Sequence, residues 1–216
     1  MLLWKARTEE NNTTVFDYYA VDEANSPLGV RPDIKSESKN DYYTDVFCFD
    51  QDGNLYVVKE ESGYKVARYD PTVDGSYDFT NPLIPSSNPF GTDKITAIAV
   101  DTSGTITSGG DTYNALYYCY EYVPNNYRIK RIRWQTTQKF STAATDPSWT
   151  EIFESSPVPL AANKDGLFVA TNGTSGFSIK KFKHDGSPDG DIQSHDDVGT
   201  INALQIADGV LYGIST

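Results

Sequence analysis

The sequence predicts an all-β fold, a β-propeller of about four blades in which each blade is a four-stranded antiparallel meander. Three observations predict it. A leucine followed by an aromatic residue recurs along the chain, an apolar anchor follows about 15 residues later, and no segment keeps a 3.6-residue apolar period. The 16 glycines and 11 prolines are scattered at the turns between these apolar runs.

The leucine-aromatic pairs mark the second strand of each unit. Five of the ten leucines are followed directly by an aromatic residue, whereas a 13% aromatic content predicts about one such pair. Successive pairs are 52, 61, 51 and 44 residues apart, a spacing typical of propeller repeats. The pairs are Leu3-Trp4, Leu55-Tyr56, Leu116-Tyr117, Leu167-Phe168 and Leu211-Tyr212.

The third strand of each unit follows at a nearly constant offset. The offsets from leucine to anchor are 15, 14, 16 and 15 residues, and short polar or glycine-bearing segments between the two runs predict hairpin turns. The second and third strands therefore form one rigid unit. The anchors are Tyr18, Tyr69, Ile132 and Phe182.

The first and fourth strands complete the unit. An apolar run precedes each of the last four leucine-aromatic pairs, and an Asp-Gly or Ser-Gly turn follows this run in the sequence. These runs are predicted to be the innermost strands of their units: DVFCF (45–49), ITAIAV (95–100), PLAAN (159–163) and NALQI (202–206). Candidates for the outer, fourth strand are SYDF (76–79) and WTEIF (149–153). A single meander cannot bury both faces, so each needs neighbours stacked against it.

Three stretches resemble repeats of the NHL propeller family: VFCFDQDGNLYVV (46–58), AIAVDTSG (97–104) and DGLFVATNGTSGFSIKKFKHDGS (165–187). That family is identified by an apolar strand, D-x-x-G-N-hydrophobic-Y-V, a polar turn, and a strand ending in aromatic-D-x-x-G. The resemblance implies a propeller and leaves the activity open.

The chain is expected to be one domain, 1–216, with repeats at approximately 1–44, 45–94, 95–157 and 158–200 and a partial repeat at 201–216. It begins and ends in copies of the same strand. This favours a four-blade part of a larger, six- to eight-bladed propeller, with a compact four-bladed ring as the alternative. Exposed blade edges would then favour self-association.

Composition limits the partners. A net charge of -12 and a pI near 4.5 repel phosphate backbones and anionic lipid, so nucleic acid is not expected as a partner. No stretch approaches the roughly 20 apolar residues of a membrane helix, so no membrane insertion is expected. The Tyr-, Asn-, Thr-, Ser- and Asp-rich composition, with one methionine and two cysteines, favours an extracytoplasmic or cell-surface protein.

One segment resembles a calcium loop. DGSPDGDIQSHD (185–196) offers Asp185, Ser187 and Asp189 at positions one, three and five and Asp196 at position twelve. The alternative is a turn joining two strands, because DPTVDGSY (70–77) repeats the pattern at the same place in an earlier unit. Both interpretations stay open, and calcium is the one cofactor that the sequence suggests.

Four aromatic residues lie outside the leucine-aromatic register and are candidates for ligand contact, since aromatic rings offer flat amphipathic surface. They are Tyr42, Tyr43, Trp134 and Trp149.

The predicted innermost strands hold almost no reactive side chains, with Asp45 the one acid or base among them. The histidines, His184 and His195, are expected toward the outside of their unit. The sequence therefore favours a non-catalytic scaffold that binds a protein or glycan through loops on one face. The alternative is a propeller enzyme, a lyase or a lactonase-type hydrolase, with an active site partly in blades outside this chain.

Overall fold

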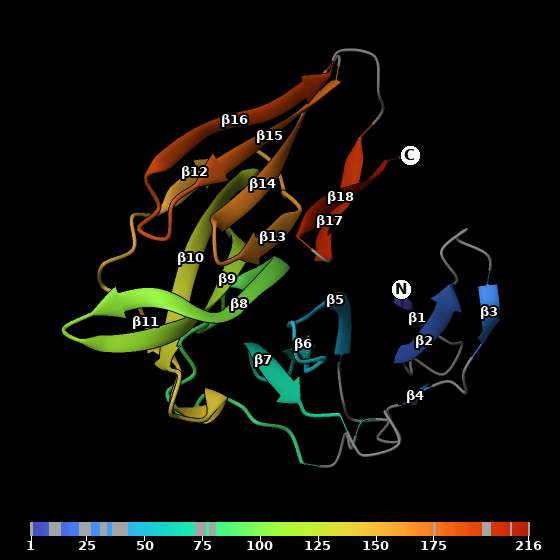
Figure 1. The fold of residues 1–216 in the computed structure, drawn as a ribbon, viewed down its shortest axis with the longest axis horizontal. Coiled ribbons are helices and arrows are strands. Elements are labelled where there is room, and N and C mark those ends of the chain that lie inside the picture. Colours follow the sequence, from blue (N-terminus) through green and yellow to red (C-terminus); the bar gives the residue numbers. More distant parts are fainter. Residues whose placement is uncertain are drawn as a thin grey trace.

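The computed structural model describes residues 2–8, 14–21, 27–30, 34–35, 43–71, 77, 81–174, 176–195, 200–207 and 209–215. Within these ranges the protein is all-β, with five sheets whose strand pairs are all antiparallel and one short 3-10 turn, η1 (Phe140–Thr142). The predicted fold class is confirmed at this level (Figure 1).

Three sheets in the middle of the chain follow the predicted meander order. The second sheet contains β5 (Tyr43–Phe49), β6 (Leu55–Glu60) and β7 (Tyr64–Tyr69). The third contains β8 (Lys94–Ser108), β9 (Asp111–Val123) and β10 (Asn126–Gln135), with β11 (Ala144–Thr145) and β12 (Ile152–Glu154) both paired to β10. The fourth contains β13 (Leu160–Asn163), β14 (Gly166–Gly173), β15 (Gly176–Phe182) and β16 (Pro188–His195).

Two further sheets lie nearer the ends of the chain. The first contains β1 (Leu2–Thr8), β2 (Thr14–Val21), β3 (Pro27–Val30) and β4 (Ile34–Lys35), and the fifth contains β17 (Ile201–Ala207) and β18 (Val210–Ser215). The predicted outer strand at 149–153 is found in part, because β12 spans Ile152–Glu154 and residues 149–151 are not in a strand. The one at 76–79 lies outside the described residues apart from Tyr77, which forms an isolated bridge with Pro71.

The strand register tests the repeat directly. Each leucine of a pair lies in the expected strand, and its cross-strand partner is the predicted anchor in three units: Leu55 opposite Tyr69, Leu116 opposite Ile132, and Leu167 opposite Phe182. In the first unit Leu3 lies opposite Tyr19, the residue next to the anchor Tyr18, so the register there differs by one residue from that of the other three units.

The first strands of four sheets lie in a row. β5 contacts β8, β8 contacts β13, and β13 contacts β17, and the later strands of each sheet extend outward from this row (Figure 1). These are the four strands that the sequence analysis placed innermost.

The core lies between neighbouring sheets, and the two faces of β9 pack in two different apolar clusters. Since successive side chains of a strand point to opposite faces, Tyr118 packs in a cluster with Tyr56 of the second sheet, whereas Tyr117 packs in a cluster with Leu167 of the fourth. Cys48 and Cys119 are free thiols in different sheets.

Candidate ligand-binding groove

A polar groove with a volume of about 890 Å³ runs between the second and third sheets. Turns of an antiparallel meander alternate between its two ends, so the β5–β6 turn and the segment after β7 lie at the same end of the second sheet. Side chains from that end form one wall, and the other comes from β8, β9, β10 and the segment that follows β10. The walls include Asp52, Arg68 and Asp70 on one side and Thr102, Trp134 and Lys139 on the other.

Asp50 also lines the groove, but its hydrogen-bonding capacity is taken up locally. Its Oδ1 accepts bonds from the backbone N–H of Asp52 (3.0 Å) and of Asn54 (2.9 Å). Its Oδ2 accepts from Asn54 Nδ2 (2.8 Å) and from the Tyr56 hydroxyl (3.2 Å). Asp50 therefore builds the turn between β5 and β6.

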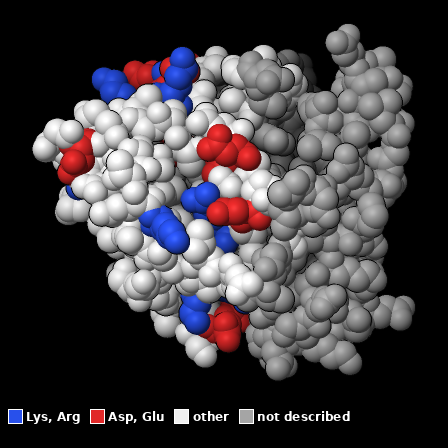
Figure 2. All heavy atoms as spheres, turned by 60° about the horizontal axis from the view of Figure 1, so that its bottom comes forward, with Lys and Arg blue, Asp and Glu red and all other residues white. Residues whose placement is uncertain are grey.

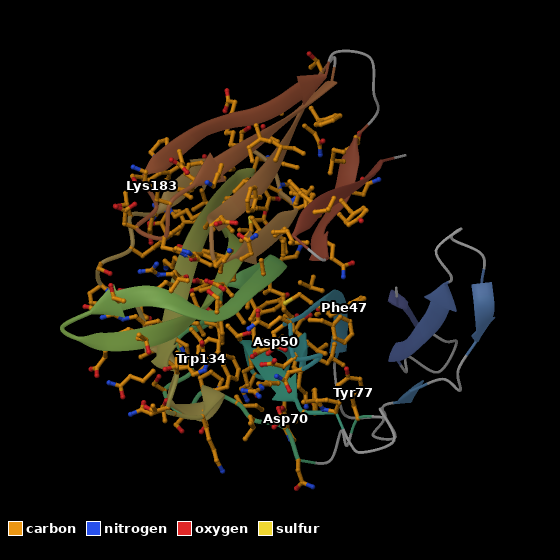
Figure 3. The ribbon with its side chains drawn as sticks, in the orientation of Figure 1. Phe47, Asp50, Asp70, Tyr77, Trp134 and Lys183 are labelled. Carbon is orange, nitrogen blue, oxygen red and sulfur yellow. The ribbon has the colours of Figure 1, made fainter. Side chains whose placement is uncertain are left out.

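Arg68 is one of the two basic residues that line the groove, with Lys139. Its Nε lies 2.9 Å from Asp70 Oδ1, close enough for an ion pair, although this buried Nε has no aligned hydrogen-bond acceptor. The guanidinium carbon is 5.9 Å from the centre of the Tyr56 ring. Figure 3 shows Asp50 and Asp70 on the side of the second sheet and Trp134 on the side of the third.

The opposite wall is rich in hydroxyl and amide groups. The Thr112 and Thr136 hydroxyls are 2.7 Å apart. The Asn114 amide, in the orientation that satisfies its neighbours, accepts from Trp134 Nε1 (3.1 Å) and donates to the Thr102 carbonyl (3.2 Å). Such groups donate and accept hydrogen bonds at short range, which suits a ligand that does both.

Of the four predicted ligand-contact residues the structure describes the side chains of two, Trp134 and Trp149, and neither is an exposed ring. Trp134 lines the groove but is only 2% exposed, and it packs against Phe140. Trp149 is 9% exposed and donates from Nε1 to the Ile129 carbonyl (2.9 Å). Packing explains both tryptophans. The side chain of Tyr43 and the whole of Tyr42 lie outside the described residues.

The predicted calcium segment has the geometry of a turn followed by a strand. The Asp185 Oδ1 accepts bonds from the backbone N–H (2.8 Å) and hydroxyl (2.6 Å) of Ser187. Asp189 lies in β16 and forms an ion pair with Lys181 (2.7 Å). Because β16 is extended, it does not wrap its side chains around one point, and this favours the turn interpretation. Asp196 lies outside the described residues.

A second polar cluster, which sequence reasoning missed, lies between the third and fourth sheets. We call it the Arg131 cluster, and it consists of Tyr117, Arg131, Asp146, Ser148 and His184. Arg131 is 2% exposed, pairs with Asp146, donates to the His184 carbonyl, and reaches Ser148 Oγ at 3.4 Å. The Tyr117 hydroxyl lies 2.7 Å from His184 Nδ1.

His184 was expected toward the outside of its unit, yet it contacts the neighbouring sheet. Its Nε2 is 3.0 Å from the Lys164 carbonyl, an acceptor, so this nitrogen carries the proton and Nδ1 accepts from Tyr117. Lys183 to Ser187 join β15 to β16, and the turn docks on the third sheet through Thr150 N–H and the Asp185 carbonyl (3.0 Å). No sequence pattern reports such a contact between sheets.

The protonation states of Tyr117 and Asp146 give the Arg131 cluster a structural role. Burial raises the pKa of the Tyr117 hydroxyl, so it stays protonated. Burial alone would also raise the pKa of Asp146, but hydrogen bonds from Ser148 and the charge of Arg131 hold that pKa below its usual range. The cluster is therefore an ionised, hydrogen-bonded pair beneath a neutral tyrosine.

The row of first strands borders a second cavity, of about 580 Å³. Its described lining is largely apolar and comes from β5, β8, β13 and β17, with Tyr212 of β18. No acid, base or histidine lines it within the described residues. Asp45, the acid expected there, lies in β5, and its side chain is outside the described set.

The described residues on the face shown in Figure 2 carry charges of both signs. Lys and Arg side chains lie beside Asp and Glu side chains in Figure 2 and do not gather in one patch. Among the residues that the structure describes, no group of three or more His, Cys, Asp or Glu side chains could hold a metal ion. Within the same residues, no helix has the length and apolar character needed to span a membrane.

The comparison with known proteins finds similarity among solved structures. No family model matches the sequence, and no curated protein matches it. Among solved structures, the chain is similar to a bifunctional GH43-CE protein from Bacteroides eggerthii, with a TM-score of 0.43 and 14% sequence identity. The match covers 94% of this chain and 27% of that one, so the chain spans about a quarter of the length of the protein it matches.

Proposed function

We propose that this chain is a non-catalytic β-propeller module that binds a glycan in the polar groove. The observation that carries the proposal is the groove itself: polar side chains from two neighbouring sheets line a space of about 890 Å³ at one end of the strands. This volume is within the roughly 300–1,000 Å³ of small-ligand sites. The propeller arrangement is supported by meander sheets whose first strands lie side by side.

The chemistry of the walls favours a glycan over an apolar ligand. Hydroxyl and amide groups of Thr102, Thr136 and Gln138 line the groove together with charges of both signs. A sugar offers many hydroxyls, each able to donate and accept, and so matches a wall of this kind. A protein ligand is the competing outcome of the experiment below.

Binding is favoured over catalysis because the buried carboxylate of the groove, Asp50, already accepts hydrogen bonds from the protein. Both oxygens of Asp50 accept two hydrogen bonds each from the protein itself. A general base must keep an oxygen free to reach the proton it removes. We therefore assign Asp50 a structural role, which is to stabilise the turn between β5 and β6.

The experiment is a screen of the purified chain on a panel of immobilised glycans, followed by titration calorimetry with each hit. Lys139→Ala, at the exposed rim, is expected to weaken binding about 2- to 10-fold. Lys164→Ala removes an exposed lysine outside the groove and is expected to leave affinity unchanged.

Two outcomes would overturn the proposal. The first is the absence of binding to any glycan at millimolar concentration, or binding that Lys139→Ala and Lys164→Ala affect equally. The second is cleavage of the bound glycan during a long incubation, detected by mass spectrometry, which would favour the enzyme alternative.

A further inference from the structure

Asn172 and Gly173 form the one asparagine-glycine pair in the sequence. They are the last two residues of β14, and they lie opposite Phe177 and Gly176 of β15. In such a pair the side-chain amide is prone to lose ammonia, because glycine has no Cβ to hinder attack by its backbone nitrogen on the asparagine side chain. The pair is therefore a place where the chain can modify itself.

In the folded protein the Asn172 amide is directed toward the next sheet. Its Nδ2 donates to the Ile201 carbonyl and its Oδ1 accepts from the Ile201 N–H, both at 2.9 Å. Ile201 is the first residue of β17 in the fifth sheet. Because both polar atoms of the amide are bonded to β17, the Asn172 Cγ cannot turn onto the Gly173 nitrogen while the fifth sheet is docked.

Apolar contacts hold the fifth sheet in this position. Ile201 is buried in a cluster with Phe168 and Ala170 of β14, and Leu204 of β17 packs against the same cluster. β17 also contacts β13. The side chain of Asn172 is released only when these contacts open together with its two hydrogen bonds.

We propose that Asn172 is a deamidation site that reacts when the fifth sheet undocks and then prevents that sheet from docking again. In the reaction the Gly173 backbone nitrogen bonds to the Asn172 Cγ, and the side-chain nitrogen leaves as ammonia, which carries away the proton of the Gly173 N–H. Water then opens the resulting cyclic imide at one of its two carbonyl carbons. The products are an aspartate or an isoaspartate at position 172.

Either product removes the contact that Asn172 makes with β17. In the aspartate a negatively charged oxygen replaces the Nδ2 donor and faces the Ile201 carbonyl, so that two acceptors meet. In the isoaspartate the main chain gains one carbon, which displaces the register of β14 against β15. The modification therefore makes a transient opening of the fifth sheet permanent. Since β17 lines the second cavity, this opening also alters that cavity.

The experiment follows the conversion of Asn172 by mass spectrometry while the intact protein is incubated in mildly alkaline buffer. The protein is expected to react at least about 10-fold more slowly than a synthetic peptide of the same local sequence, because only the open fraction reacts. Leu204→Ala weakens the packing of β17 and should speed the reaction about 10-fold. Val66→Ala, a buried substitution in the second sheet, is the matched control and should leave the rate unchanged.

Two further variants test the chemistry and its consequence. Gly173 has no left-handed φ, and an added Cβ would lie 3.5 Å from the Gly176 carbonyl oxygen, an ordinary contact. Gly173→Ala should therefore fold with the fifth sheet docked and lose ammonia more slowly than the parent. Asn172→Asp reproduces one product and should speed amide hydrogen exchange in β17 and β18.

Four outcomes would overturn the proposal. They are conversion of the folded protein as fast as the peptide, equal acceleration by Leu204→Ala and Val66→Ala, no conversion in Leu204→Ala over a time in which the peptide converts, and unchanged exchange in β17 and β18 of Asn172→Asp. The comparison with the peptide uses the unaltered protein, so it does not depend on whether any variant folds.

Discussion

The Tyr117 hydroxyl donates a hydrogen bond to His184 Nδ1 over 2.7 Å, and this bond joins the third sheet to the fourth. The histidine belongs to the turn between β15 and β16, and its other nitrogen donates to the Lys164 carbonyl. One side chain thus holds a turn of one sheet against a strand of its neighbour.

Replacing His184 is expected to destabilise the protein. In His184→Ala the buried Tyr117 hydroxyl loses its partner, which costs about 1–3 kcal/mol of unfolding free energy. Urea denaturation measures this loss. The double variant with Tyr117→Phe should recover part of it, because no unpaired hydroxyl is then buried. A loss below about 0.5 kcal/mol in the single variant would contradict the role given to this bond.

The pH dependence of stability is expected to include Asp146. Its pKa in the folded protein is lower than the ordinary value of 3.8, so its contribution is complete above that value and is lost as the pH falls through the folded pKa. In Asp146→Asn the unfolding free energy should fall less between about pH 6 and pH 2.5 than in the parent. Asp165→Asn, at an exposed position, is the control and should keep the parental slope.

Two glycines with nearly the same backbone conformation should differ in their response to alanine. Gly186 has φ of +87° and an added Cβ would lie 2.4 Å from the Thr150 carbonyl oxygen, whereas Gly53 has φ of +81° and open space around it. Both substitutions place an alanine in the left-handed conformation, which is expected to lower the free energy of unfolding by about 1–2 kcal/mol. Only Gly186→Ala adds a clash between sheets, so its thermal midpoint should fall clearly further. Equal shifts would mean that the 183–187 turn can move away from the third sheet at little cost.

Asn172 is expected to hold the fifth sheet to the fourth. Its amide donates to the Ile201 carbonyl and accepts from the Ile201 N–H, both at 2.9 Å. Asn172→Ala should speed amide hydrogen exchange in β17 and β18 far more than in β6, because the broken contact is local. Unchanged protection at Ile201 would show that apolar contacts alone dock this sheet.

Much of the fold follows from the sequence because it depends on local pattern. The leucine-aromatic pairs predicted the second strands, and the nearly constant offset to the anchors predicted that a third strand follows in the same unit. The structure alone shows which residues lie opposite each other: Leu55, Leu116 and Leu167 lie opposite the anchors of their units, whereas Leu3 lies opposite Tyr19. Strand order followed from short turns, which the sequence displays directly.

The candidate site depended on contacts that no local pattern carries. Trp134 and Trp149 looked like ligand-contact residues, but packing between sheets buries them. Arg68 and Arg131 each lie opposite the aromatic residue of a leucine-aromatic pair. The turn that contains His184 packs against Arg131, whereas Arg68 lines the groove.

The sequence by itself therefore determined the first three strands of the repeat units and their order, because these follow from apolar runs and turns between nearby residues. Only the tertiary structure decided which polar side chains face a groove and which are sealed in the core. Whether a polar side chain is exposed or buried depends on the contacts between two sheets. Those contacts come from the volume and hydrogen bonds of residues that are far apart in the chain, such as Tyr117 and His184.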